Sequence, residues 1–532
     1  MKNNHFFLLI FLIPAVLNSC RLDIEPLTTL SPSSFWNTEQ DLQMALNSIY
    51  RYTFLDGFRT DLQTVDAYES NPNTVSSGTY TPTNTDNYWK TSYIQIRTAN
   101  SFLENYQKAN VNESLKCRYA GEARFFRAYF YTYLLQRFGD VPYVEKTLDM
   151  NSPELYAPCT PRAEVLSKIM EDIRYAVDNI PGKSALSSDV GRITKGAALT
   201  LQARVALYFG TLYKFHGLGE YKTLLTLAKT AAKSVIDDGE YALYENYRNL
   251  FLQAGNDNSE SIMTLRHTPD AGPGTNRSRQ MIFDFSFSPT KYLADAFLCS
   301  DGLPIDKSPL FQGYLPLGAE FNHRDPRMAL TIWRPYDPDY QMQPQPFIPS
   351  FAANTVTGYM FKKYAADISP SYTHDLLMRY AEVLLIYAEA AYEIEESISD
   401  SDLNISINTL RRRFKSNPDC LPDLTNAFVT ANNLNMREEI RRERRVELAG
   451  ESFRYGDLIR WKTAETELPQ DILGAKLDKK VYPSVEKPLT TDGFIILQYA
   501  TTRTFNSDRD YLFPLPLLQL SLNKNLTQNP NW

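Results

Sequence analysis

One stretch, Ala120–Phe138, constrains the fold more than any other part of the chain. Apolar residues recur in it every three or four positions, and aromatic residues fill most of the positions between them. This spacing predicts a helix that is apolar nearly all round, which is typical of a helix buried among other helices. Gly139 and Pro142 follow, and both residue types are common just after a helix end. Because Arg124 and Arg127 lie inside this helix, we expect them to pair with carboxylates or aromatic rings in a structural network.

Helical periodicity continues along much of the chain. We expect further helices at residues 39–54, 88–106, 160–180, from 194 onward, and at 221–236, 375–395, 403–414 and 436–448. Successive helices of this kind form antiparallel hairpins at a spacing near that of tetratricopeptide repeats. The chain has 532 residues, which is longer than most chains that fold around a single hydrophobic core. The sequence therefore predicts a mainly α fold with two lobes or a helical array.

The helical rhythm fails over residues 241–375, where proline, glycine, aspartate and aromatic residues dominate. We predict an irregular inserted lobe there, with short strands at Ser261–Arg266 and Tyr359–Tyr364. Turn-forming residues also cluster at 56–87, and long loops usually carry function or disorder. The helical scaffold is then expected to span residues 39–240 and 376–532, the second part ending in a C-terminal tail.

The first residues have the pattern of a targeting segment. Lys2 precedes the apolar run Phe6–Leu17, which is too short to span a bilayer comfortably. Leu17-Asn18-Ser19-Cys20 resembles a bacterial lipobox, in which the cysteine receives acyl chains. We therefore predict a signal peptide at residues 1–19, a lipid anchor on Cys20 and a tether over residues 20–38. The alternative is an ordinary secretory signal in which Cys20 is incidental.

Composition and motifs exclude several functions. The formal net charge of −7 argues against nucleic acid as a partner, because phosphate binding demands clustered cations. The sequence contains no HExxH, GxSxG, phosphate-binding loop or dinucleotide-type glycine pattern, and its five histidines are isolated. We predict no catalytic residues, no metal site and no cofactor, although the abundant carboxylates leave a glycosidase pair open. The alternating Arg and Glu residues at 437–447 are interpreted as an ion-pair ladder on a helix surface.

Several motifs, spread in order over essentially the whole chain, resemble the SusD/RagB family of outer-membrane lipoproteins. They are Leu22-Asp23 and Pro26 after Cys20; Trp89, Tyr93, Ile96 and Asn100; residues 122–142, which include Phe138-Gly139-Asp140-Val141-Pro142; residues 195–204; Asp325-Pro326-Arg327; residues 378–390; residues 441–461; Phe513-Pro514-Leu515-Pro516; and residues 525–530.

The resemblance implies about four tetratricopeptide-like hairpins with a loop-rich lobe. It also implies a non-enzymatic, lipid-anchored protein of the outer membrane that captures an oligosaccharide at the cell surface. The partner would be a SusC-like TonB-dependent transporter, to which the ligand is handed. Three alternatives remain open: a peptide-importing lipoprotein of the same type, a lipid-anchored helical glycoside hydrolase, and an adaptor that only bridges proteins.

Candidate ligand-binding residues follow from sugar chemistry. A sugar offers apolar C–H faces ringed by hydroxyls, so its site needs flat aromatic rings with polar side chains at their edges. Two loop regions have that mixture, and they contribute Asp66, Tyr80 and Asn84, and Asn276, Arg277, Trp333, Arg334 and Tyr336. Trp333 heads this group because it lies in a proline-stiffened segment, but it could equally be a core tryptophan of the lobe. Trp89 and Trp461 lie on helical periodicity, and we expect them in the core.

Overall fold

The structure is a computed structural model that describes residues 35–50, 59–272, 274, 287–338, 345–352, 355–365 and 371–532. Cys20, Asn276 and Arg277 lie outside these ranges, so their predicted roles stay predictions. Within the described ranges, no helix is both long and apolar enough to cross a membrane.

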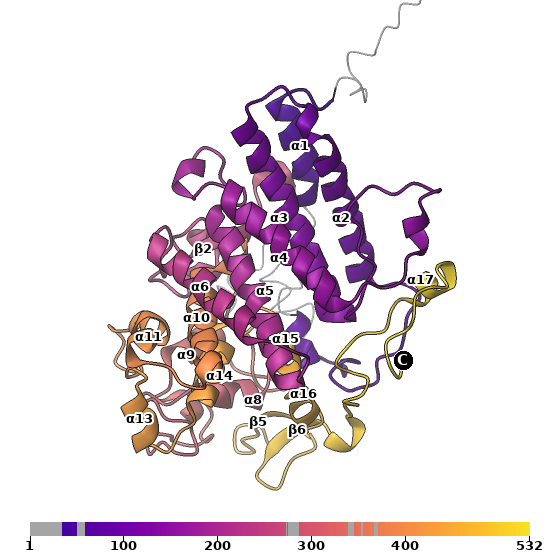
Figure 1. Ribbon diagram of the computed structural model, residues 1–532. Coiled ribbons are helices and arrows are strands. Elements are labelled where there is room, and N and C mark those ends of the chain that lie inside the picture. The colour runs from indigo at the N-terminus through magenta and orange to yellow at the C-terminus, as the bar shows by residue number, and fades with distance from the viewer. Residues whose placement is uncertain are drawn as a thin grey trace, which may run out of the picture.

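Packed helices form most of the molecule (Figure 1). They are α1 (Glu39–Tyr50), α2 (Asn87–Asn105), α3 (Glu113–Phe138), α4 (Arg162–Asn179), α5 (Lys195–His216), α6 (Lys222–Asp238), α10 (Tyr380–Glu395) and α14 (Met436–Glu447). Each packs against its neighbour in this order as far as α6, and α10 packs against both α6 and α14. This arrangement confirms the predicted mainly α fold built from helical hairpins.

The aromatic helix α3 lies at the centre of the first hydrophobic core, as predicted. Phe126 and Phe130 on α3 are fully buried. Arg127 forms a buried ion pair with Asp172 of α4 at 2.7 Å, and Arg124 reaches the same carboxylate at 2.9 Å. The two arginines therefore join α3 to α4 in the structural network that the sequence predicts.

Short antiparallel strand pairs lie outside the helical hairpins. They are β1 (Ala67–Tyr68) with β3 (Ser288–Pro289), β2 (Ser261–Leu265) with β4 (Asp375–Arg379), and β5 (Ile472–Lys476) with β6 (Phe494–Gln498). The strand predicted at 261–266 is confirmed by β2. The helix predicted from 375 instead begins at Tyr380, because residues 375–379 pair with β2. The strand predicted at 359–364 was wrong, since Phe361 makes only an isolated bridge to Ile332.

A second hydrophobic core gathers residues that are far apart in the sequence. Its members include Phe287, Phe297, Trp333, Phe351 and Phe361, together with residues near β5 and β6. The boundaries proposed for the inserted lobe, residues 241 and 375, remain predictions.

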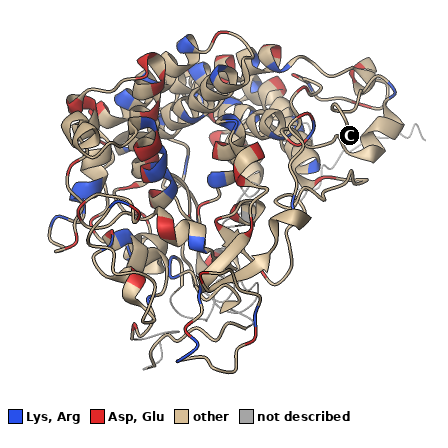
Figure 2. Ribbon diagram, turned by 90° about the horizontal axis from the view of Figure 1, so that it is seen from below, with Lys and Arg blue, Asp and Glu red and all other residues tan. Residues whose placement is uncertain are grey.

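The interpretation of α14 as a surface ladder was wrong. Glu443 and Glu447 of α14 are at most 1% exposed. Arg327 lies 2.7 Å from Glu443 and 3.0 Å from Glu447, while Arg379 lies 2.8 Å from Glu447. Acidic and basic residues are accordingly intermingled along neighbouring elements in Figure 2. We call the following group the buried ion cluster: Glu260, Arg327, Lys363, Arg379, Arg411, Arg413, Glu443, Glu447 and Glu451.

The buried ion cluster connects the two cores. Arg327 belongs to α9 (Pro326–Thr331), whereas Arg379 ends β4 and Glu447 ends α14. Burial alone would raise the pKa of Glu447, but Arg413, Arg379 and Arg327 hold it well below its usual value. Glu447 is therefore a carboxylate whose charge fixes the position of α9 against α14.

Candidate functional site

Trp333 lies in the second core and is only 5% exposed. Its backbone N–H donates to the Met360 carbonyl at 2.9 Å. The Phe347 ring lies 6.2 Å from the indole, and the Lys362 ammonium lies 4.6 Å from the centre of the indole. A stacking platform must expose its ring face, so this placement supports the alternative interpretation of Trp333 as a core residue.

Tyr336, by contrast, is presented to solvent. It is 54% exposed, and its backbone adopts φ = 71°, in the left-handed region that is uncommon for residues other than glycine. Its backbone N–H donates to the Phe347 carbonyl at 2.8 Å, which holds the turn in place. Burial raises the pKa of Tyr482 to about 12, and the nearby Tyr336 contributes to that shift. The turn therefore presents the Tyr336 ring to solvent.

Polar side chains from two segments form a hydrogen-bonded group that includes Arg334, two residues before Tyr336. The exposed Arg334 donates to the side-chain oxygen of Asn322 at 2.8 Å. The amide nitrogen of Asn322 donates in turn to Gln312, also at 2.8 Å. We call Gln312, Asn322, Arg334 and Tyr336 the outer face. Sequence reasoning found Arg334 and Tyr336 and missed Gln312 and Asn322, which come from an earlier segment. Each of these follows a phenylalanine, Phe311 or Phe321, and that aromatic neighbour is a signal that could have found them.

A buried acid, Glu320, lies in the chain between two residues of the outer face, Gln312 and Asn322. Glu320 is 4% exposed and accepts a hydrogen bond from the Tyr359 hydroxyl at 2.8 Å. Burial raises the pKa of Glu320 to about 7, Asp295 adds to the shift, and the Tyr359 bond opposes it. The carboxyl group is therefore half protonated near neutral pH.

Replacing Glu320 with glutamine is expected to stabilise the protein increasingly as the pH rises. Because the pKa of Glu320 is raised in the folded protein, this residue contributes stability that is fully present below its ordinary pKa of 4.5. That stability is lost as the pH rises through the folded-state pKa of about 7. Glutamine keeps the acceptor but does not ionise, so the variant should gain about 2–3 kcal/mol relative to the unchanged protein between pH 4.5 and about 8. Urea midpoints at both ends of this range measure the gain. Glu438→Gln, at a side chain that is 60% exposed, is the control, and a pH-independent difference for Glu320→Gln would contradict the assignment.

The first predicted loop region lies elsewhere. Tyr80 is half-buried, with its ring centre 5.4 Å from Phe513 and 6.0 Å from Trp532. The Asn84 side chain is exposed, and its backbone carbonyl accepts a hydrogen bond from Leu518. This region is therefore clamped by the C-terminal tail, and Tyr80 packs on the first core while Trp333 belongs to the second.

Asp66 has a structural environment. It is 4% exposed and accepts from Arg445 at 2.9 Å, with Arg454 at 3.5 Å. Burial alone would raise the pKa of Asp66, but the two arginines hold it below its usual value. The side chain is thus committed to these ion pairs.

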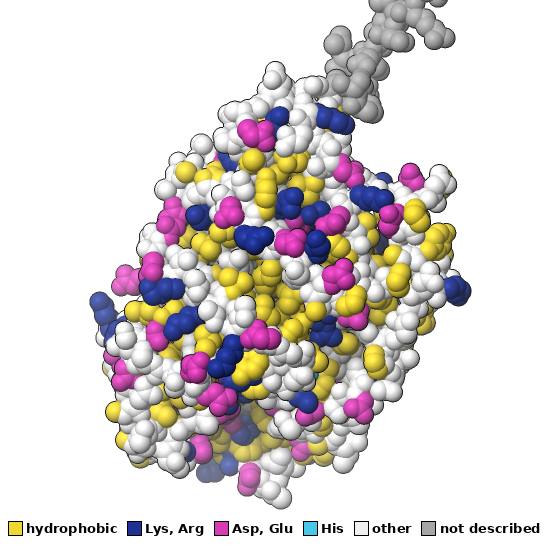
Figure 3. Space-filling view, viewed as in Figure 1, with side chains coloured by type: hydrophobic (Ala, Val, Ile, Leu, Met, Phe, Trp, Pro, Cys, Tyr) yellow, Lys and Arg dark blue, Asp and Glu magenta, His cyan; other side chains and the backbone are white. Residues whose placement is uncertain are grey.

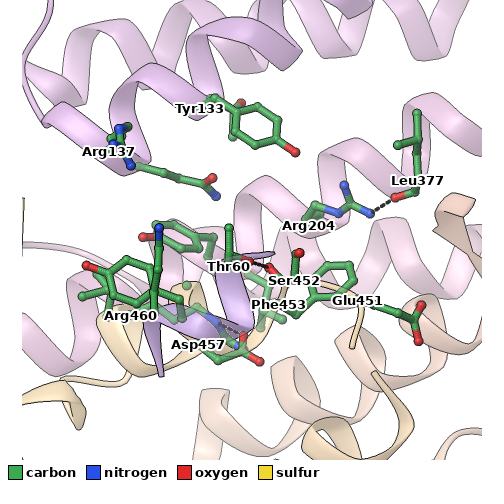
Figure 4. A pocket seen from close by; sticks show the side chains of 18 of the residues that line it. Thr60, Tyr133, Arg137, Arg204, Leu377, Glu451, Ser452, Phe453, Asp457 and Arg460 are labelled. Carbon is green, nitrogen blue, oxygen red and sulfur yellow. Dashed lines mark hydrogen bonds and ion pairs between the residues drawn. The ribbon is translucent and has the colours of Figure 1, made fainter. Parts of the chain in front are cut away.

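A cavity of about 220 Å³ lies between the helical hairpins and the C-terminal third of the chain (Figure 4). Tyr133 of α3 and Arg204 of α5 face Phe453, which immediately precedes α15 (Arg454–Arg460). The polar and aromatic residues that line the cavity include Thr60, Gln63, Tyr88, Tyr129, Thr132, Tyr133, Gln136, Arg137, Arg204, Tyr208, Arg444, Ser452, Phe453, Tyr455, Asp457, Arg460, Tyr511 and Phe513. Sequence reasoning missed this cavity because its walls come from segments hundreds of residues apart.

The charged groups of the cavity wall are paired within the protein. Arg204 binds Glu382 at 2.6 Å, and Arg444 binds Asp457 at 2.9 Å. Glu451 binds Arg379 at 2.7 Å, and its carboxylate points away from the centre of the view in Figure 4. Burial would raise the pKa of Glu451, but Arg379 and Lys363 hold it below its usual value. It is therefore a poor proton donor.

Among the described residues, the carboxyl groups with a raised pKa are buried. A glycosidase needs one carboxyl group with a raised pKa beside the scissile bond. Burial raises the pKa of Asp61 to about 8 and that of Glu320 to about 7, but each side chain is only 4% exposed. Among the described residues, no group of three or more His, Cys, Asp or Glu side chains could hold a metal ion. On the face seen in Figure 3, charges of both signs alternate with apolar side chains, unlike the cationic track that phosphates require.

Comparison with known proteins places these features in a family. A family profile described as "SusD family" matches residues 257–532, which is more than half of the chain. A second, described as "Starch-binding associating with outer membrane", matches residues 25–207. SusD-like protein P38 of Formosa agariphila is 26% identical over 516 residues, covering 91% of this chain and 96% of that protein.

Solved structures agree with these matches. A SusD-like carbohydrate-binding protein from Bacteroides fragilis superposes with a TM-score of 0.79 at 26% identity, covering 93% of this chain and all of the other. A laminarin-binding SusD-like protein has a TM-score of 0.65 at 19% identity, with 93% of this chain covered, and shows a likeness of fold.

Proposed function

Because this chain belongs to the SusD family, we propose that it is a cell-surface lipoprotein that binds a glycan and delivers it to a SusC-like TonB-dependent transporter. The observation that carries the proposal is the likeness, over 93% of the chain, to a carbohydrate-binding protein of the same fold. The lipobox-like sequence before Cys20 and the profile that names the outer membrane support the location. The protein acts by capture, without cleaving its ligand.

The outer face is the site that we propose for the glycan. Tyr336 supplies an exposed ring for the apolar side of a sugar. Arg334, Asn322 and Gln312 supply donors and acceptors for its hydroxyls. A polysaccharide needs an open surface, because its chain must continue beyond the bound sugars. Asn276 and Arg277, which lie outside the described residues, remain predicted ligand-binding residues.

Replacing Tyr336 with alanine is expected to weaken glycan binding about tenfold or more, because the sugar loses its stacking surface. Calorimetry with a panel of plant, host and microbial glycans, and a peptide pool, measures the effect. Tyr499→Ala is the matched control, since Tyr499 is 48% exposed against 54% for Tyr336. Glycan binding that survives Tyr336→Ala but is lost in Tyr80→Ala would move the site to the first loop region. Binding of peptides alone would reject a glycan as the ligand.

A further inference from the structure

We propose that the cavity beside α3, α5 and α15 is a second binding site, which accepts a neutral sugar unit about the size of a monosaccharide. This site is separate from the outer face, and the inference goes beyond glycan capture at that surface. It rests on the unpaired polar groups, the aromatic faces, the pairing of charges and the size of the cavity.

The cavity wall carries hydrogen-bonding groups that the protein leaves unused. Gln63, Gln136, Tyr208 and Tyr455, whose side chains carry amide and hydroxyl groups, line the cavity. The Ser452 hydroxyl and one terminal nitrogen of Arg444 are buried and have no hydrogen-bond partner among the described residues. Arg444 as a whole is only 5% exposed. Buried polar groups are almost always paired in folded proteins, so the buried Ser452 hydroxyl and Arg444 nitrogen indicate an occupant that supplies hydroxyls.

Aromatic rings provide the second element of sugar recognition. Phe453 and Phe513 line the same cavity as Tyr133 and Tyr455. In Figure 4 the Tyr133 ring reaches down from α3 toward the space above Phe453. A pyranose has apolar C–H faces and polar edges, and this wall offers partners for both.

The charges indicate a neutral ligand. Arg204, Arg444 and Asp457 line the cavity, and each is already in an ion pair inside the protein. Arg137 pairs with Asp86 at 2.8 Å, and Arg460 pairs with Glu389. An ionic ligand would have to compete with these pairs, whereas a neutral sugar leaves them intact.

The volume limits the size of the ligand. Pockets for drug-sized molecules span about 300–1,000 Å³, so a cavity of 220 Å³ suits a smaller one. Several lining residues, including Gln136, Tyr455 and Gly456, are partly exposed, so water and small solutes reach the wall. The ligand is therefore a free monosaccharide or the end unit of a longer chain.

Gly456 offers a direct test. A Cβ atom added there would meet only the Tyr208 ring, at 3.6 Å, which is an ordinary contact. Gly456→Leu should therefore fill the cavity without disturbing the helix, while Gly456→Ala fills less of it. Gln136→Met and Tyr455→Phe remove one polar group each and keep the side-chain size. Tyr499→Phe changes an exposed tyrosine and serves as the control.

The measurement is ligand-detected NMR and thermal unfolding of the full-length protein in mild detergent, with neutral hexoses, pentoses and N-acetylhexosamines at up to about 10 mM. We expect saturable binding of at least one sugar, weakened about tenfold by Gln136→Met or Tyr455→Phe, abolished by Gly456→Leu and unchanged by Tyr499→Phe. Oligosaccharides ending in the same sugar distinguish an end unit from a free monosaccharide. If no sugar binds, or if binding is insensitive to all three cavity variants, the cavity holds only water and the proposal is rejected. The effect of Tyr336→Ala on glycan binding is measured in its own experiment, so the proposal for one site can be rejected while the other stands.

Discussion

Replacing Arg379 with alanine is expected to lower the free energy of unfolding by about 3–5 kcal/mol. Arg379 is 2% exposed, and its guanidinium binds Glu260, Glu447 and Glu451 at 2.7–2.8 Å. Removing it leaves buried carboxylates with fewer cations in a medium that solvates charge poorly. The urea midpoint at neutral pH measures the loss.

Arg412→Ala is the matched control for this change. Arg412 also pairs with a carboxylate, Asp423, but the two side chains are 49% and 39% exposed. An exposed pair contributes about 0–1 kcal/mol, so the control should be nearly neutral. The folded protein holds the pKa of Glu447 below its ordinary value of 4.5, and the stability that this gives is lost as the pH falls below that value. The difference between Arg379→Ala and the unchanged protein should therefore narrow in acid, and equal effects of the two substitutions would contradict the role of the buried ion cluster.

Replacing Cys20 with alanine is expected to move nearly all of the protein from the membrane fraction to the soluble fraction. The acyl chains on this cysteine would be the anchor, and each buried CH₂ contributes about 0.8 kcal/mol to membrane binding. Cell fractionation with immunodetection measures the change, and labelling of intact cells reports exposure at the surface. Cys117→Ala keeps the lipobox-like sequence and should leave the distribution unchanged. A Cys20→Ala protein that stays in the membrane fraction would reject the lipid anchor.

The sequence predicts those parts of the fold in which local pattern and tertiary structure agree. Ala120–Phe138 is apolar nearly all round, and it forms most of the buried helix α3. Trp89 and Trp461 lie on helical periodicity, and they are 6% and 3% exposed in the structure. The resemblance to the SusD/RagB family is confirmed by the profile match.

The errors have a common physical cause, which is that partners distant in the sequence decide the outcome. Residues 375–379 have an apolar run compatible with a helix, but β2, more than a hundred residues earlier, pairs with them as a strand. An exposed ladder and a buried cluster can have the same spacing of Arg and Glu along a helix. In this protein α14 belongs to a buried cluster, because Arg327 pairs with Glu443 and Arg379 pairs with Glu447.

The candidate sites show the same limit. A turn-rich context predicted that Trp333 and Tyr336 lie in a loop, but only the packing of Phe347 and Lys362 separates the buried ring from the exposed one. The cavity could not be found from the sequence, because Gln63, Gln136 and Tyr455 come together only through the packing of α3 on the C-terminal third.

The central claim, capture of a glycan without cleavage, is tested most directly by measuring binding and product in the same sample. Full-length protein is titrated with each glycan of the panel in a calorimeter, and the recovered mixture is assayed for new reducing ends. We predict saturable binding to at least one glycan with no reducing ends above the protein-free control. New reducing ends in proportion to protein and time would contradict this account and identify the chain as a hydrolase.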